Sequence, residues 1–325
     1  MTSEPGRTDA AHRVRPVIPE WLDRTGPDAV ALAVQLLGRC TFPVAGTSVV
    51  CGVSGGADSS ALVVLAVLAG CEATAVHVDH GLREGSAEEA NVVERLAALV
   101  GACFEARTAI VMPGPNLEAR ARTARHRALG TDALLGHTAD DQAETVLLAM
   151  LRGSGLAGLA GIAPARHPIL GLRRAETVAL VTALGLHPID DPTNDSPVHR
   201  RNRVRHELLP LLDDLAERDV AALLARQAAL LRDDSELLDE LATDLDPGDA
   251  RALGAAPAAL ARRAVRRWLA PLLGGYPPDA AAVGRVLAVA RGEAQACEVA
   301  GFEGGPLRIA RSRGKLRVTG ITADR

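Results

Sequence analysis

The hydrophobic pattern of this chain alternates between short apolar runs and longer stretches with helical spacing. The apolar runs predict buried strands over residues 49–53, 73–78, 103–111 and 133–136. Helical spacing covers residues 28–40, 58–68, 86–100, 117–129 and 176–185. Because strands and helices alternate, we expect an α/β fold built on a parallel, doubly wound sheet. In such sheets, ligands bind at the carboxyl ends of the strands.

The remaining part of the chain shows a different pattern. Residues 152–175 are glycine-rich and residues 188–206 are polar, so both predict loops. A long helix over 219–245, two helices over 257–273 and 279–291 and a β-ribbon over 298–318 are expected to follow. We therefore predict three parts: a flexible N-terminal tail (1–27), a catalytic α/β domain (28–215) and a smaller C-terminal α+β domain with a helical linker (216–325).

Composition narrows the class of protein. Apolar residues make up 48% of the 325 residues, which is enough for a large core, and five cysteines occur without any C-x-x-C pair. This argues against zinc, an iron–sulfur cluster and disulfides, and favours a reducing compartment. The N-terminus lacks the apolar core of a signal peptide, and no apolar run is long enough to span a bilayer. We expect a cytoplasmic protein without a membrane partner.

Charge is distributed unevenly. The net charge is −4, but residues 251–325 hold 13 basic and 5 acidic side chains. Four arginines on the predicted helix over 257–273 form one basic stripe suited to an RNA backbone: Arg262, Arg263, Arg266 and Arg267. A second arginine run includes Arg201 and Arg205. Both runs are consistent with phosphate contacts or with solvated faces, and arginine abundance also follows from a GC-rich genome.

The loop after the first predicted strand has the composition of a phosphate cradle. It reads Ser54-Gly55-Gly56-Ala57-Asp58-Ser59-Ser60 and leads into a helix. A glycine pair lets backbone N–H groups approach a ligand, hydroxyls add donors, and the helix N-terminus favours an anion. The loop has no Walker lysine, while Asp58 suits a Mg²⁺ ion carried by the phosphates. An ordinary strand-to-helix turn is the alternative.

Acidic residues follow the fourth predicted strand. Glu144 follows Asp141 by three residues and Asp140 by four, and each of these spacings places two carboxylates on one helix face. Such a cluster could hold Mg²⁺ at Asp141, or bind and deprotonate an amine nucleophile. It could also be a solvated helix N-terminus, where acids are favoured by the dipole.

Histidines occupy predicted strand ends. His77, His80 and His137 lie there together with Asp79, but their spacing is not that of a zinc site. Polar lining of a nucleotide pocket is the favoured interpretation.

The motif S-G-G-x-D-S at 54–59 resembles the loop of N-type ATP pyrophosphatases, the PP-loop superfamily. Further blocks occur in order: 77–83, 116–125, 136–145, 152–155, 191–194 and 201–210. Together these seven blocks resemble the tRNA(Ile)-lysidine synthase family, in the form that has a single C-terminal domain. The superfamily's usual strand order, 3-2-1-4, would place the phosphate loop and the acidic turn in one cleft.

This resemblance implies an ATP-dependent tRNA modification. The family adenylates the wobble cytidine of a tRNA(Ile) with a CAU anticodon, then joins free L-lysine to carbon 2 and releases AMP and pyrophosphate. Residues 54–60 would hold MgATP, with Val78, His80 and His137 lining the pocket. Asp58 and Asp141 would bind Mg²⁺, and Arg122 would neutralise the α-phosphate. Asp141 and Glu144 would position the lysine amine.

The resemblance is incomplete at two positions, and it leaves alternatives. His126 stands where the family often has tyrosine, and His167 stands where it often has arginine. A tRNA cytidine 2-thiolase uses a similar loop, but such enzymes need cysteine pairs. A non-catalytic ATP-binding module would leave the acids and arginines without a role. A homodimer is possible.

Overall fold

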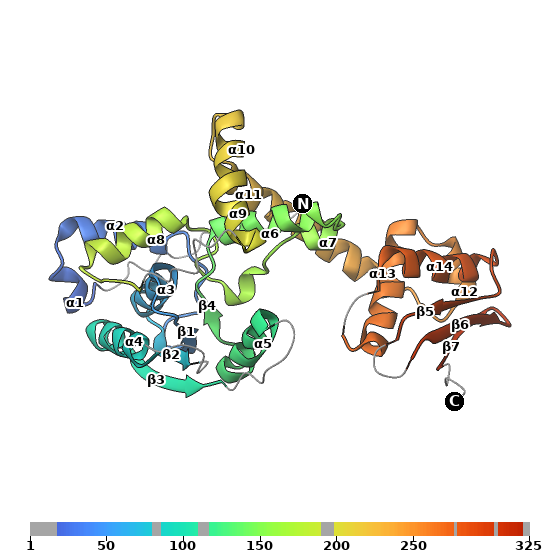
Figure 1. Cartoon of the computed structure of the whole chain (residues 1–325), viewed down its shortest axis with the longest axis horizontal. Coiled ribbons are helices and arrows are strands. Elements are labelled where there is room, and N and C mark those ends of the chain that lie inside the picture. Colours follow the sequence, from blue (N-terminus) through green and yellow to red (C-terminus); the bar gives the residue numbers. More distant parts are fainter. Residues whose placement is uncertain are drawn as a thin grey trace, which may run out of the picture. The chain divides into compact units, whose positions relative to one another are not determined.

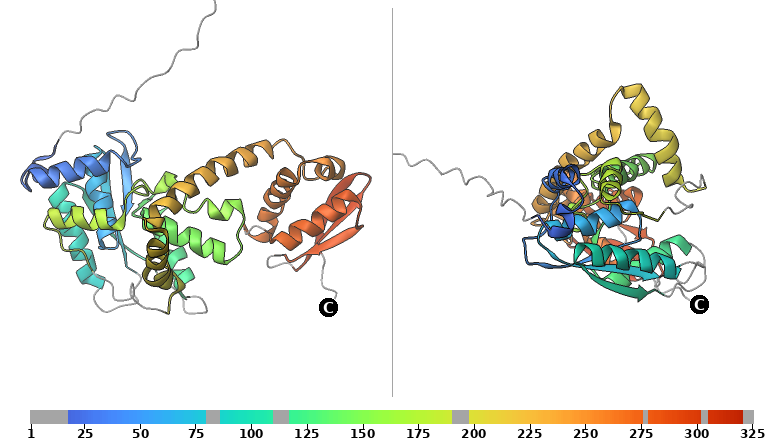
Figure 2. Two further views of the ribbon diagram at one scale, coloured as in Figure 1. Left: turned by 90° about the horizontal axis from the view of Figure 1, so that it is seen from above. Right: turned by 90° about the vertical axis from the view of Figure 1, so that its left-hand side faces the viewer.

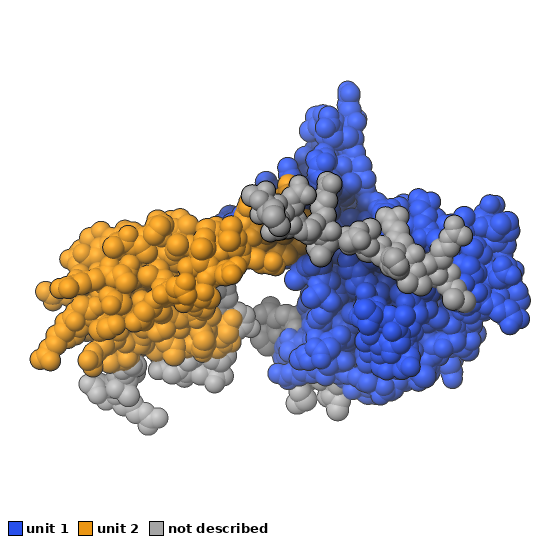
Figure 3. Space-filling view, turned by 180° about the vertical axis from the view of Figure 1, so that it is seen from behind, with its two compact units in different colours: residues 1–228 blue, residues 229–325 orange. Residues whose placement is uncertain are grey.

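The structure is a computed structural model that describes residues 18–79, 86–109, 117–189, 198–275, 278–301 and 305–320 (Figure 1). The chain forms two compact units, Met1–Ala228 and Ala229–Arg325 (Figure 3). The boundary between them falls within a long helix, α11 (Val220–Leu241). The domain boundary at 215/216 stays a prediction.

The first unit is built on a four-stranded parallel sheet. Its strands are β1 (Ser48–Gly52), β2 (Glu72–Asp79), β3 (Cys103–Thr108) and β4 (Leu134–Leu135). Their order is β3-β2-β1-β4, and every pair is parallel. The predicted α/β class and the strand order are confirmed. β1 and β4 are neighbours, so the loops that follow them leave the same edge of the sheet.

Helices cover both faces of this sheet (Figure 2). They are α2 (Pro27–Leu37), α3 (Ala57–Leu68), α4 (Ser86–Val100), α5 (Leu117–Leu129) and α8 (Arg174–Ala183). One core cluster joins α2, α3, α4 and α8 to one face of β1 and β2. A second cluster joins α5 to the other face through Val76, Val78 and Leu129. Alternate residues of β2 therefore point to different clusters, as the period of a strand requires.

Three segments differ from the predicted elements. Residues 18–27, placed in the flexible tail, include α1 (Glu20–Asp23), whose Leu22 is fully buried. The glycine-rich loop over 152–175 contains two short helical turns, α7 (Leu156–Leu159) and η1 (Pro164–Arg166), and α8 begins at Arg174 rather than at 176. The buried side chain of Gln142 fixes this loop, because it bonds to the backbone of Ala160 and Ile162.

The described part of the predicted irregular segment, residues 198–206, is mostly helical. It contains α9 (Arg200–Arg203) and continues through η3 (Val204–Leu208) into α10 (Leu209–Ala216). Polar composition hid this helix, which is stabilised by packing. Val204 and Leu209 are buried against Ala143 and Leu147 of α6 (Ala139–Leu151). This contact carries the arginines of the segment to the acidic turn.

The second unit combines helices with a small antiparallel sheet. Its helices are α12 (Ala250–Ala255), α13 (Ala258–Leu269), η4 (Ala270–Leu273) and α14 (Ala280–Arg291). Its strands β5 (Ala296–Val299), β6 (Leu307–Ser312) and β7 (Lys315–Gly320) pair in that order. Val299, Ile309 and Leu316 bury one sheet face against α13 and α14. In the described part of the chain, no helix has the length and apolarity that a membrane crossing requires.

Candidate active site

The phosphate loop leaves β1 and is held by its own hydroxyls. The Ser59 hydroxyl donates to the Gly56 carbonyl (3.0 Å), and it lies 3.2 Å from both the backbone nitrogen and the hydroxyl of Ser54. Gly55 has φ +86°, and a Cβ there would lie 2.4 Å from Cδ1 of Ile189. The backbone conformation therefore disfavours any other residue at this position, and a side chain would also have to displace the end of Ile189.

Gly136 brings the acidic turn against the phosphate loop. A Cβ at Gly136 would lie 2.8 Å from the carbonyl oxygen of Asp58, so the chain after β4 touches the first turn of α3. This close approach confirms that the two loops share one edge of the sheet. It also places Asp58, Asp141 and Glu144 within reach of the same side chains.

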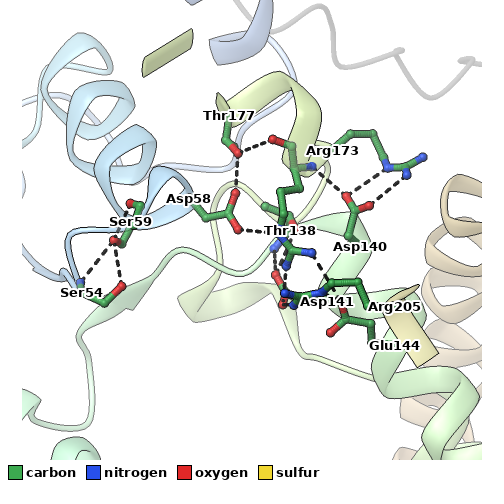
Figure 4. Close-up of polar contacts among 12 residues, drawn as sticks. Ser54, Asp58, Ser59, Thr138, Asp140, Asp141, Glu144, Arg173, Thr177 and Arg205 are labelled. Atoms are coloured by element: carbon green, nitrogen blue, oxygen red, sulfur yellow. Dashed lines mark hydrogen bonds and ion pairs between the residues drawn. The ribbon is translucent and has the colours of Figure 1, made fainter. Parts of the chain in front are cut away.

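Three carboxylates and three guanidiniums form one partly buried cluster at this point (Figure 4). The carboxylates belong to Asp58, Asp141 and Glu144, and their side chains are 20%, 10% and 0% exposed. Arg174 contacts all three, at 3.1, 3.0 and 3.4 Å respectively. It therefore joins the phosphate loop to the acidic turn through a single side chain.

Arg201 and Arg205 complete the cluster. Arg201 pairs with Glu144 and lies 3.0 Å from Asp141, while Arg205 lies 2.7 Å from Glu144. The fully buried Glu144 thus receives three guanidiniums, which is the condition under which a buried charge is tolerated. Three negative and three positive charges balance within the cluster.

The environment shifts the two aspartate pKa values in opposite directions. Burial raises the pKa of Asp58, and the Arg174 charge and the Thr177 hydroxyl bond only partly offset it. Burial also acts on Asp141, but the charges of Arg174 and Arg201 outweigh it and lower its pKa. Asp141 is therefore the more firmly ionised of the two.

A second acid–arginine pair flanks this cluster. Asp140 accepts from the guanidinium of Arg173 at 2.9 and 3.0 Å and from the backbone nitrogen of Arg174 at 2.7 Å. The other acid of the turn, Asp141, accepts from the backbone and hydroxyl of Thr138, which closes a capping box at the start of α6. Both acids are thus fixed in orientation.

Histidines lie beside the acidic turn. The rings of His137 and His167 meet edge to face, with centroids 4.7 Å apart. Nδ1 of His137 is buried and has no hydrogen-bond partner among the described residues. Burial lowers the pKa of His137 to about 4, although the Asp141 charge opposes the shift. The charges of Arg122 and Arg201 also lower this pKa, so His137 is neutral at physiological pH.

His77 is buried and contacts the backbone just before the phosphate loop. It is 3% exposed, and its Nδ1 lies 3.1 Å from the carbonyl oxygen of Val53, the residue before the loop. Since a carbonyl only accepts, Nδ1 carries the proton. Nε2 lies 3.9 Å from the Glu89 carboxylate on α4.

The other predicted site residues fall in different places. Ala57, Asp58, Ser59 and Ser60 form the first turn of α3, and Ser59 and Ser60 are buried. The side chain of Val78 packs in the cluster under α5. His80 lies outside the described residues.

Arg122 lies on α5 and is exposed. Its charge lowers the pKa of His137 and of His167, so its guanidinium lies near this pair. Arg125, one turn further along α5, is more buried, and burial lowers its pKa.

The arginine stripe of α13 divides into two pairs. Arg263 bonds to Ser235 and Asp239 (3.2 and 2.6 Å), and Arg267 donates to the Ala242 carbonyl (2.8 Å). These two fasten the end of α11 and the turn after it to α13. Arg262 is exposed, and Nε of Arg266 is buried without a hydrogen-bond partner in the part of the chain that the structure describes.

Sequence reasoning missed Arg174 and Thr177. Both lie at the start of α8, where the pattern gave no motif, and both contact Asp58, more than 110 residues earlier. The pair Arg173-Arg174 before an amphipathic helix was the available signal, because two cations disfavour a helix N-terminus unless acids neutralise them.

The site suits a divalent cation by its donor chemistry. Asp58 and Asp141 each present a carboxylate oxygen about 3 Å from a different nitrogen of the Arg174 guanidinium. Among the described residues no group of three or more His, Cys, Asp or Glu side chains could hold a metal ion, so these two carboxylates would share the ion with phosphate oxygens. Oxygen ligands of this kind are those that Mg²⁺ uses beside phosphates. The residues present therefore fit the ion, with Arg174 holding the corresponding positive charge here.

Comparisons with known proteins bear on the family of this chain. Residues 33–212 match the PP-loop domain family, and residues 249–317 match the TilS substrate binding domain. The tRNA(Ile)-lysidine synthase of Nocardia farcinica is 44% identical over 85% of this chain and 92% of its own length. That of Rhodococcus opacus is 37% identical over 98% and 97%. Among solved structures, the U34-tRNA thiolase NcsA from Methanococcus maripaludis matches with a TM-score of 0.48 and 17% identity, covering 63% of this chain and 79% of that one.

The sheet order and the glycine loop define a PP-loop ATP-utilising protein. The match covers more than half of the chain, and the relatives match almost from end to end. The chain belongs to the tRNA(Ile)-lysidine synthase family. The predicted family and ligase class are thereby confirmed.

Proposed function

We propose that this protein joins L-lysine to carbon 2 of the wobble cytidine of a tRNA(Ile) with a CAU anticodon, at the cost of ATP. Membership of the family supports the reaction that we propose. The cluster of acids around Arg174 supports the roles that we assign to individual residues. A tRNA 2-thiolase is not favoured, because the relatives are lysidine synthases.

In the first step, the loop 54–60 holds the triphosphate through backbone N–H groups and hydroxyls. The O2 atom of the cytosine attacks the α-phosphorus, the bond to the β-phosphate oxygen breaks, and pyrophosphate leaves. Arg122 neutralises charge on the α-phosphate. Asp58 and Asp141 would hold a Mg²⁺ ion, which supplies charge neutralisation for the phosphates when bound.

In the second step, the side-chain amine of lysine attacks carbon 2, and the bond from carbon 2 to the oxygen shared with AMP breaks. A lysine ammonium has a pKa near about 10.4 in water and must lose a proton before it attacks. Asp141 and Glu144 position this amine and assist its deprotonation. Their negative charge becomes available to the amine when the guanidiniums that neutralise it here move to other partners.

A pocket next to Glu144 fits the lysine side chain. It has a volume of about 180 Å³ and is lined by three acids (Asp140, Glu144 and Asp213), two arginines (Arg173 and Arg205) and the apolar residues Leu209, Pro210 and Ala221. The acids outnumber the arginines by one, so the lining is net negative beside an apolar wall. A side chain with an aliphatic stem and a cationic end matches this combination. We assign the pocket to free lysine.

Contacts to tRNA are divided between the two units. Arg201 and Arg205 remain candidates for the anticodon arm, but their guanidiniums contact Glu144 and Asp141, so a phosphate would have to compete with these acids. In the second unit we favour Arg262 and Arg266 over the other two arginines of α13. We propose a cytoplasmic location for the enzyme, and a homodimer stays a prediction.

The direct test supplies the protein with ATP, labelled lysine and a CAU-anticodon tRNA(Ile) transcript. We expect label on the tRNA and one AMP per label, whereas ADP as product would refute nucleotidyl transfer. Asp58→Ala is expected to abolish AMP formation without unfolding the protein. Near-normal turnover of this variant would refute a role for Asp58 in binding Mg²⁺ at the phosphate site.

A further inference from the structure

Unpaired polar groups gather on one side of the site. Around Arg174 every carboxylate has a guanidinium partner. The neighbouring arginines and histidine, by contrast, have no such partners in the part of the chain that the structure describes. Arg122 and Arg125 have neither an ion pair nor a hydrogen bond within the described residues, and the same holds for both ring nitrogens of His137. The buried, unpaired Nδ1 of His137 carries a cost that a ligand can offset, whereas the exposed Arg122 is hydrated and open to a ligand.

His167 has a defined tautomer. Its Nδ1 lies 2.7 Å from the Ala163 carbonyl oxygen, and since the carbonyl accepts, Nδ1 carries the proton. Burial and the charges of Arg166 and Arg122 lower the pKa of His167, so the ring is neutral at physiological pH. Nε2 is therefore a lone-pair acceptor, and it has no hydrogen bond among the residues that the structure describes.

The histidine pair lies near the two groups that act on the reacting carbon. The charge of Arg122 acts on both rings, and so does that of Asp141. In the proposed reaction, Arg122 serves the phosphate attached to O2, while Asp141 serves the amine that attacks carbon 2. A cytosine whose O2 and C2 lie between these groups must present its Watson–Crick edge to the neighbouring side chains.

We propose that the His137–His167 pair selects cytosine at the wobble position, with Nε2 of His167 accepting a hydrogen bond from the 4-amino group of the base. The inference rests on the proposed function, which supplies the substrate. Cytosine presents an amino donor at this position, where uracil presents a carbonyl acceptor. An acceptor facing a carbonyl would leave two acceptors opposed, and uracil would be rejected. His137 packs edge to face on His167 and holds its orientation.

The test measures kcat/KM for tRNA(Ile) transcripts that carry cytidine, uridine or 2-pyrimidinone riboside at position 34. For the unmodified enzyme we expect a loss of at least ten-fold when the 4-amino group is missing, and a larger loss with uridine. This measurement needs no variant, so misfolding does not affect it. Equal rates with cytidine and 2-pyrimidinone would overturn the proposal.

Two variants separate hydrogen bonding from packing. His167→Phe keeps a ring and removes the acceptor, so it should lose at least ten-fold on cytidine and show no further loss on 2-pyrimidinone. His167→Gln supplies an amide oxygen in place of Nε2 and should restore part of the preference. His187→Phe, on the loop after α8, is the matched control and should change neither rate.

The same data distinguish the possible failures. If the unmodified enzyme makes no lysidine from the cytidine transcript, the proposed function fails. If it makes lysidine but His167→Phe keeps its preference for cytidine over uridine, the inference about His167 fails. If His167→Phe raises KM for ATP and leaves this preference intact, the pair serves the adenine amino group, and the proposal is overturned.

Discussion

Replacing Arg174 by methionine tests whether one guanidinium holds the site together. The substitution leaves both Glu144 and Asp141 with Arg201 and Arg205. Among the described residues, Asp58 then keeps only the Thr177 hydroxyl as a side-chain partner. Removing one partner of a buried ion pair costs about 3–5 kcal/mol. Because the Arg174 side chain is 26% exposed, we expect the lower end, about 3 kcal/mol.

Tryptophan fluorescence makes this measurement specific to the first unit. The chain has two tryptophans, Trp21 in the first unit and Trp268 in the second. In a Trp268→Phe background, Trp21 alone reports urea unfolding of the first unit. Arg39→Met is the matched control, since Arg39 is 43% exposed and its surface pair with Glu176 should contribute less than about 1 kcal/mol. Equal losses for the two variants would refute the central role of Arg174.

Magnesium extends the same experiment. If Asp58 and Asp141 share a cation position, Mg²⁺ should bind there in Arg174→Met, in place of the lost guanidinium. This binding would stabilise the variant. At ten times the dissociation constant the gain would be about 1.4 kcal/mol. Adding Asp58→Asn should abolish this gain. A gain that persists without the Asp58 carboxylate would show that Mg²⁺ binds elsewhere.

Other expectations concern tRNA binding and pH. Replacing both Arg262 and Arg266 by Gln should reduce the slope of log affinity for tRNA against log salt by about 1.5, as measured by filter binding. Replacing both Arg263 and Arg267 by Gln should chiefly lower the stability of the second unit, as measured by urea unfolding. The reverse pattern would contradict this division of the four arginines. The lowered pKa of His137 means that between about pH 6.5 and 4 the unfolded chain binds a proton that the folded chain does not. Stability of the first unit should therefore fall as pH drops through this window, and less steeply in His137→Gln; an unchanged slope would refute the shift.

Elements with their own periodic signal could be predicted from the sequence. The helix α4 has the predicted bounds, because its apolar positions recur with helical spacing and pack on the sheet. The loop 54–59 was recognisable because its residue types are dictated by close approach to backbone and phosphate. In both cases the determining interactions are local in sequence.

Features that depend on distant partners were missed. Residues 200–206 have the composition of a loop, and they are helical because Val204 and Leu209 pack on α6 and because Glu144 neutralises Arg201 and Arg205. Arg174 carries no motif, and its role is defined by Asp58, 116 residues away. The same reason divides the α13 stripe, where the acceptors of Arg263 and Arg267 lie 24 to 28 residues upstream. Spacing shows which residues share a face, but the partner decides what that face does.

The charge distribution of the site implies an order of substrate binding. The acid cluster is neutral, since its three carboxylates already have three guanidiniums, while unpaired positive charge lies at Arg122 nearby. Triphosphate is therefore attracted before any rearrangement, but a lysine ammonium meets acids that arginines already occupy. Bound phosphates would compete for these guanidiniums and so release the carboxylates for the amine. We infer that ATP binds first and raises lysine affinity at least ten-fold. Calorimetric titration of lysine with and without a non-hydrolysable ATP analogue measures this coupling, and equal affinities would show that the arginines do not block the acids.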